Sequence, residues 1–269
     1  MEAKTIIDLN YVDLALVYGV ILLIVALCRH WRTGQEKDLT IASLRMVVQL
    51  LAVGYLLHLV FRIESPWPVI LILIVMVGFA IQTVSSRVKE KMPRFYRIVS
   101  VSIFVGCGLT TFFFCQIVVG LSPWYDPRYL IPLAGMIIGN SMTGASLAAE
   151  RLASEMKERR DEIETSLCLG ATSRLASREI VQGAFRAALI PSINSMAAMG
   201  IVFLPGLMTG QILSGTEPIL AVKYQIAIMC IISGSVAITS LLIINQGSRV
   251  YFSAAEQLLE VQDGGVRRP

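Results

Sequence analysis

The amino-acid sequence predicts an all-α, polytopic integral membrane protein of about seven transmembrane helices. Apolar residues make up 55% of the chain, charged residues make up 16%, and the mean hydropathy is +0.68. Soluble proteins average roughly 45–50% apolar and about 25% charged residues, so this composition favours lipid as the surrounding solvent. Two further observations support the same class: long apolar stretches recur along the whole chain, and basic residues are concentrated in alternate loops.

Each apolar stretch is long enough to cross a bilayer as a helix. A hydrocarbon core of about 30 Å needs about 20 residues of α-helix. The predicted spans are residues 11–28, 41–61, 67–84, 98–121, 129–149, 187–207 and 224–245. Asp13 and Arg45 are the charged residues within these spans, and both lie in the first two. Because no basic region precedes the first segment, we expect a retained helix rather than a signal peptide.

The distribution of Lys and Arg tests this layout independently, because short basic loops are retained in the cytoplasm. Loops 29–40, 85–97, 150–186 and 246–269 contain 3, 5, 7 and 3 of these residues. The opposite segments contain one each, namely Lys4, Arg62, Arg128 and Lys223. We therefore expect an external N-terminus, a cytoplasmic C-terminus and a single transmembrane domain over residues 1–250. Residues 251–269 are expected to form a cytoplasmic tail, disordered beyond about Leu259.

The cytoplasmic loop 150–186 is predicted to contain a short helix-turn-helix. It has seven basic and seven acidic residues, so it has no net charge to attract nucleic acid. Apolar residues recur four apart and predict one stripe on a helical segment: Ile163, Leu167, Ala171 and Leu175. Gly170 suits a left-handed helix end, and Thr172 or Ser173 can cap a following helix.

The predicted helix-turn-helix has two interpretations that remain open from the residues alone. It can lie on its own helix bundle, or it can be a docking element for a cytoplasmic partner. The outward-facing charges available to such a partner are Glu164, Arg174, Arg178 and Glu179. Residues 164–170, with Ile180 ten positions after Gly170, resemble the EAA loop that couples ABC-transporter permeases to their ATPase subunits.

Several further strings extend this resemblance over about residues 10–252. They are Arg45-x-x-x-Gln49 with Val53-Gly54-Tyr55, and the segments 135–142, 167–172, 186–191, 204–210 and 221–225. Together they resemble the FetB (YbbM) family of ABC permeases. The family's alanines after the acidic residue are Thr165 and Ser166 here, and its terminal Leu-Pro is Gln182-Gly183.

The resemblance implies a permease subunit of a bacterial inner-membrane transporter, partnered by a separate FetA-type ATPase and associated with iron export. It implies ATPase coupling through Glu164, Leu167, Gly170, Ala171 and Arg174. ATP and Mg²⁺ would belong to the partner subunit, and this chain would bind no cofactor. The sequence agrees independently, because it lacks the GxxxxGK[ST] loop that holds nucleotide phosphates. ABC architecture further implies two permease copies with two ATPases, surrounded by membrane lipids.

Polar residues in the fifth span allow two interpretations. Gly135 and Gly139 form a small-xxx-small pair that favours close helix packing, with interhelical hydrogen bonds from nearby polar groups. Alternatively, Asn140, Ser141 and Met142 line a translocation pathway, because oxygen and sulfur atoms suit a passing metal.

The end of the sixth span contains Pro205 and Gly206, which should interrupt a helix. This segment is either an ordinary helix end or a hinge at an outer gate, with Met208 and Gln211 near the exit. In the second span, Arg45 and Gln49 lie one turn apart on one face. Arg45 can pair with a carboxylate such as Glu150 or contact substrate, and we favour the pair.

No metal-ligand motif is evident, so the metal site stays unknown. His30 and His58 are far apart, and the five cysteines show no CxxC spacing and are expected to be reduced packing residues. No span carries a catalytic pair, so an intramembrane enzyme is the least favoured class. A stand-alone secondary transporter or channel remains the main alternative to an ATP-driven permease.

Overall fold

The computed structural model describes residues 10–63, 65–88, 92, 94–253, 255–262 and 265–267. The chain divides into two compact units, which are described separately. The first comprises Met1–Glu64 and Gly210–Thr216, and the second comprises Ser65–Thr209 and Glu217–Pro269. The single transmembrane domain expected over residues 1–250 stays a prediction.

The first unit contains two long apolar helices, α1 (Tyr11–His30) and α2 (Glu36–Val60), which pack against each other. The Asp13 carboxylate accepts a hydrogen bond from the Asn10 N–H at 2.9 Å, so this charge caps the start of α1. Tyr18 and Ser43 join the two helices through their hydroxyl groups at 3.1 Å. Most other apolar side chains of α1 and α2 are exposed, as lipid-facing residues would be.

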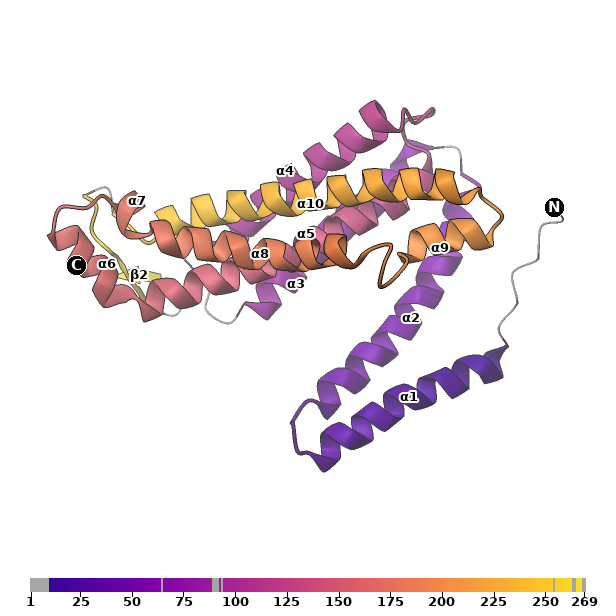
Figure 1. Cartoon of the computed structure of the whole chain (residues 1–269), viewed down its shortest axis with the longest axis horizontal. Coiled ribbons are helices and arrows are strands. Elements are labelled where there is room, and N and C mark those ends of the chain that lie inside the picture. Colours follow the sequence, from indigo (N-terminus) through magenta and orange to yellow (C-terminus); the bar gives the residue numbers. More distant parts are fainter. Residues whose placement is uncertain are drawn as a thin grey trace. The chain divides into compact units, whose positions relative to one another are not determined.

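The second unit is a bundle organised around α5 (Pro127–Glu158), which packs against four other helices. These are α3 (Pro66–Arg87), α4 (Phe95–Phe112), α8 (Arg178–Ala198) and α10 (Pro218–Arg249). A π-helix, η1 (Phe113–Val118), continues α4. Figure 1 shows α5, α8 and α10 running side by side, with α6 (Arg160–Cys168) and α7 (Ser173–Ala176) beyond one end.

Among the described residues, six helices are long and apolar enough to cross a membrane, which confirms the all-α, multi-pass class. They are Val12–His30, Glu36–Val60, Pro66–Arg87, Phe95–Val118, Pro127–Glu158 and Pro218–Arg249. Each coincides with one predicted span. The orientation of the chain across the membrane stays a prediction.

The predicted span 187–207 differs from the structure. Its helix, α8, begins at Arg178 and ends at Ala198, and α9 (Gly206–Leu213) follows after a non-helical segment. The chain turns at Gly200, whose φ is +82°, and Met199 bridges to Phe203. From Arg186 to Ala198 the helix rises only about 18 Å, less than the roughly 30 Å of a hydrocarbon core. The sixth predicted span is therefore an interrupted helix.

Close helix packing occurs at Gly106, Gly144 and one glycine of the predicted pair, Gly135, where a Cβ would lie 3.1 Å from Met76 Cε on α3. A Cβ on Gly106 would overlap Thr239 Oγ1, and one on Gly144 would lie 2.5 Å from Val236 Cγ1. By contrast, a Cβ on Gly139 would meet nothing within 4 Å. The prediction that Gly139 admits another backbone is therefore wrong within the chain, because α4, α5 and α10 make their closest approaches on other faces.

Two three-residue strands, β1 (Glu260–Gln262) and β2 (Gly265–Arg267), pair antiparallel at the C-terminal end of the described residues, with Val261 opposite Val266. The disorder expected beyond about Leu259 stays a prediction.

Candidate functional site

The most distinctive feature of the second unit is the element between α5 and α8. α5 continues to Glu158, nine residues past the predicted end of its span, and α8 begins at Arg178. At a rise of 1.5 Å per residue, those nine residues carry α5 about 13 Å further. The short helices α6 and α7 are therefore held away from the apolar bundle by two long helices.

The turn between α6 and α7 is built by Gly170. Its φ is +89°, a left-handed conformation that glycine adopts without steric cost. The Ala171 N–H donates to the Ser166 carbonyl at 3.0 Å, and the Gly170 N–H donates to the Leu167 carbonyl at 3.0 Å. These two bonds form a Schellman motif, which satisfies carbonyl groups at the end of α6. The predicted left-handed cap is confirmed.

The start of α7 is capped as the sequence predicts. Thr172 is the N-cap residue, and its hydroxyl accepts a hydrogen bond from the Leu175 N–H at 3.3 Å. Because α6 ends before this cap, the predicted single apolar stripe is wrong. Ile163 and Leu167 share α6, whereas Ala171 lies in the turn and Leu175 lies on α7.

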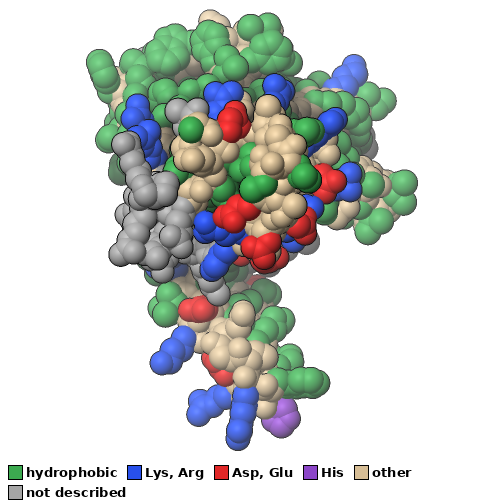
Figure 2. All heavy atoms as spheres, turned by 90° about the vertical axis from the view of Figure 1, so that its left-hand side faces the viewer, with side chains coloured by type: hydrophobic (Ala, Val, Ile, Leu, Met, Phe, Trp, Pro, Cys, Tyr) green, Lys and Arg blue, Asp and Glu red, His purple; other side chains and the backbone are tan. Residues whose placement is uncertain are grey.

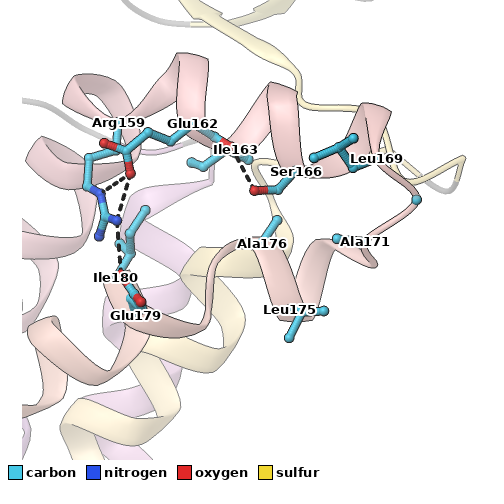
Figure 3. A pocket seen from close by; sticks show the side chains of 11 residues that line it. Arg159, Glu162, Ile163, Ser166, Leu169, Ala171, Leu175, Ala176, Glu179 and Ile180 are labelled. Atoms are coloured by element: carbon cyan, nitrogen blue, oxygen red, sulfur yellow. Dashed lines mark hydrogen bonds and ion pairs between the residues drawn. The ribbon is translucent and has the colours of Figure 1, made fainter.

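A pocket of about 520 Å³ opens between α6, α7 and the start of α8 (Figure 3). It is lined by Arg159, Glu162, Ile163, Ser166, Leu169, Gly170, Ala171, Leu175, Ala176, Glu179 and Ile180. Ile163 and Ile180 are each only 1% exposed, whereas Leu169 is 84% exposed. The pocket thus combines buried isoleucines with an exposed leucine.

Ion pairs fix one side of this pocket. The Arg159 guanidinium lies 2.7 Å from Glu162 Oε2 and 3.0 Å from Glu179 Oε2, so it joins the start of α6 to α8 (Figure 3). The hydrogen bonds from Arg159 to these two carboxylates raise the pKa of its guanidinium. Figure 2 looks onto this end of the unit and shows acidic and basic side chains intermixed beside apolar ones.

The five predicted coupling residues have different surroundings in the structure. Gly170 and Ala171 line the pocket, whereas Glu164 forms an ion pair with Arg160 at 2.7 Å along α6. Leu167 is half-buried, and Arg174 is exposed without an ion pair to any other described residue. Their coupling role stays a prediction.

Sequence reasoning did not single out the pocket residues Leu169 and Arg159. Leu169 immediately precedes the cap glycine, and side chains at such a helix end are often exposed. This position therefore indicates an exposed leucine. The Arg159–Glu162 spacing is also typical of a helical ion pair. The contact between Arg159 and Glu179 spans 20 residues and has no local sequence signal.

The predicted pathway residues of α5 lie on different faces. Asn140 is exposed, and its amide donates to the Met136 carbonyl at 2.8 Å. Ser141 is fully buried, and its hydroxyl lies 2.8 Å from that of Ser235 on α10. Met142 is half-buried. Ser141 therefore serves helix packing, while a pathway role for Asn140 and Met142 stays a prediction.

Removing the Ser141–Ser235 contact should lower the free energy of unfolding of the helix bundle. Interhelical hydrogen bonds of this kind contribute about 0.6 kcal/mol on average in double-mutant cycles. We expect Ser141→Ala and Ser235→Ala, alone and combined, to show a coupling energy of this order in unfolding measurements. Asn140→Ala, as the matched control, should show no coupling with Ser235→Ala. A coupling energy of zero for the Ser141 cycle would contradict the packing role.

The remaining predicted residues are distributed over both units. Arg45 and Gln49 are exposed on α2 of the first unit, so the predicted pairing of Arg45 with Glu150 stays a prediction. Pro205 immediately precedes α9, and its carbonyl accepts a hydrogen bond from the Thr209 N–H at 2.9 Å. Gly206 is the first residue of α9. The hinge role of Pro205 and Gly206 stays a prediction.

Met208 and Gln211 both lie on α9 and are half-buried. The side-chain oxygen of Gln211 is buried and has no hydrogen-bond partner among the described residues. Within the same residues, no group of three His, Cys, Asp or Glu side chains is positioned to hold a metal ion. All five cysteines are free thiols.

The family model for UPF0014, described as an uncharacterised protein family, matches residues 11–252, which is most of the chain. The chain belongs to the UPF0014 family. Its predicted resemblance to FetB proteins is thereby confirmed, because a FetB protein is among its relatives. With six helices suited to a bilayer in the described part of the chain, this UPF0014 protein is a multi-pass membrane protein.

Three relatives of this chain match it over most of their own length. A UPF0014 membrane protein of Synechocystis sp. is 36% identical over 94% of this chain and 98% of its own. Protein ALUMINUM SENSITIVE 3 of Arabidopsis thaliana is 32% identical over 82% and 80%, respectively. The probable iron export permease protein FetB of Escherichia coli is 27% identical over 93% and 95%. No solved structure matches this UPF0014 chain.

Proposed function

We propose that this protein is the transmembrane permease subunit of an ABC transporter. In this proposal the helices α6 and α7, with the turn between them, form the docking element for a separate cytoplasmic ATPase of the FetA type. The concentration of basic residues in loop 150–186 supports a cytoplasmic location for this element. The relationship to the probable iron export permease FetB supports a role in transport.

The exposed Leu169 carries the proposal. Its side chain is 84% exposed at the edge of the pocket, and Leu175 on α7 is 59% exposed. These leucines lie beyond the long bundle helices, where lipid does not cover them if the basic loops are cytoplasmic. Exposed apolar residues around a concave site are typical of protein–protein contacts. A cytoplasmic ATPase surface would bury them.

Replacing Leu169 should weaken ATPase binding. Burial of a leucine side chain contributes about 1.5–3 kcal/mol, so Leu169→Glu should lower the affinity for the FetA-type ATPase of the same organism roughly 10- to 100-fold. Leu169→Met preserves an apolar side chain and should bind nearly normally. Affinity is measured on detergent-solubilised full-length protein. Equal affinities for the Leu169→Glu and unaltered proteins would refute the assignment of the docking element.

We further propose that the complex contains two permease chains and two ATPases and exports a metal ion, with iron as the first candidate. ATP and Mg²⁺ would bind to the ATPase subunit. The test is export from vesicles containing the purified complex, with iron, other metals and small organic solutes supplied separately. ATP-dependent export is expected. Equal rates with and without ATP would instead favour a stand-alone secondary transporter or channel.

A further inference from the structure

The C-terminal turn, residues 251–253 and 255–259, folds into a compact structure after α10. The Leu259 N–H donates to the Tyr251 carbonyl at 2.8 Å, and Phe252 bridges antiparallel to Leu258. Within the turn, the Ser253 hydroxyl accepts hydrogen bonds from the Ala255 and Gln257 N–H groups, each at 3.2 Å. Tyr251 is only 7% exposed and anchors the start of the turn. These contacts hold the backbone at residue 256 in place.

Glu256 lies in a backbone conformation that glutamate rarely adopts. Its φ is +60°, in the left-handed region that costs a residue with a Cβ roughly 1–2 kcal/mol. Such conformations persist only where surrounding contacts stabilise them, and they are concentrated at functional positions. The contacts of the Glu256 side chain are therefore informative.

The Glu256 carboxylate reaches across 83 residues of sequence to the docking element, where it accepts a hydrogen bond from the Ser173 N–H. Ser173 is the first residue of α7, and its N–H has no partner within the helix. Hydrogen bonds from the Ser173 side chain and backbone hold the pKa of Glu256 below its ordinary value. A glutamate carboxylate is charged at neutral pH, and a negative charge interacts favourably with a helix N-terminus.

Two side chains thus secure the start of α7 from different directions. Thr172 acts locally through its bond with the Leu175 N–H, and Glu256 acts from the C-terminal turn. α7 contains only four residues, too few to be stable alone. It also supplies Leu175 and Ala176 to the pocket wall. The position of this wall therefore depends on the contact with Glu256.

We propose that Glu256 is a positioning residue for the docking element, holding α7 so that the pocket between α6 and α7 is open to the ATPase. The inference rests on the proposed docking function. It makes the C-terminal turn part of the docking structure, although it lies more than 70 residues after the loop that resembles the EAA motif. Glu256 does not need to contact the ATPase itself.

The test uses Glu256→Gly in the full-length protein. Glycine adopts a φ of +60° without strain, so the turn should keep its fold while the carboxylate is lost. Subsecond hydrogen exchange of residues 169–176 should become roughly tenfold faster, as expected for loss of a helix cap. ATPase affinity should fall by a similar factor. Glu256→Gln keeps an acceptor oxygen, so its exchange rate and ATPase affinity should lie between those of Glu256→Gly and the unaltered protein. Gln257→Ala, which changes an exposed neighbouring side chain, should match the unaltered protein.

Three outcomes would overturn the inference. Unchanged exchange in Glu256→Gly would show that the carboxylate does not hold α7. Faster exchange with unchanged ATPase affinity would show that the position of α7 does not govern docking. If the unaltered protein binds no ATPase, the proposed function fails and this inference fails with it, whatever the exchange rates.

Discussion

If the proposed function holds, Gly170→Ala should uncouple the protein from the proposed ATPase subunit. An L-residue held at a φ of +89° is strained, at a cost of about 1–2 kcal/mol, although a Cβ there would contact nothing within 4 Å. The turn should relieve this strain by changing conformation, which moves α7 relative to α6. We expect ATPase affinity to fall roughly 5- to 30-fold, together with the stimulation of ATP hydrolysis. Binding is measured with the purified full-length proteins.

Gly183→Ala is the matched control for this experiment. Gly183 lies on α8, and its Cβ would make an ordinary contact of 3.6 Å with the Glu155 carboxylate. Since alanine favours helix over glycine, this variant should bind the ATPase normally. Normal binding by Gly170→Ala as well would mean that the geometry of the turn does not determine docking.

Gly106→Ala should destabilise the helix bundle of the second unit. Its Cβ would overlap Thr239 Oγ1 and lie 3.1 Å from the Thr239 Cα, so rotation of the Thr239 side chain alone cannot relieve the close contact. α4 and α10 must move apart. We expect the free energy of unfolding to fall by about 1–3 kcal/mol and the melting temperature by roughly 3–10 °C. Thermal unfolding in detergent measures the change.

Gly108→Ala provides the comparison on the same helix, because a Cβ at Gly108 would meet nothing within 4 Å. It should leave the melting temperature unchanged or raise it slightly. Adding Thr239→Ala to Gly106→Ala should recover part of the loss by removing the hydroxyl that makes the closest contact. Identical melting temperatures for the two single variants would show that the Gly106 approach is not tight in the membrane.

The parts predictable from sequence were those that depend on local chemistry. Composition and apolar length located six of the helices, and Gly170 and Thr172 correctly predicted the turn between α6 and α7. The apolar periodicity across residues 163–175 predicted a single helical stripe. This prediction was wrong because the glycine cap at Gly170 ends the helix and breaks the period. The sequence signal for a helix end was stronger than the signal for one continuous stripe.

Features that depend on tertiary contacts could not be predicted. Asn140 and Ser141 are adjacent, but neighbouring residues on a helix point in directions about 100° apart, so one is exposed and one is buried. The contact between Glu256 and Ser173 joins two segments with no shared motif. Gly106 and Gly139 look alike in sequence, and only the neighbouring helix distinguishes a tight approach from open space.

The continuity of α5 has a mechanical consequence. Its 32 residues form one helix that contacts α3, α4, α8 and α10 and leads to the start of α6. At 1.5 Å per residue it is about 48 Å long, so a tilt of about 5° displaces one end by about 4 Å relative to the other. In the proposed transporter, a force applied to α5 near α6 would therefore be transmitted along this helix to the opposite end of the bundle. A small displacement caused by the proposed ATPase at α6 would thus become a larger movement at the other end of α5.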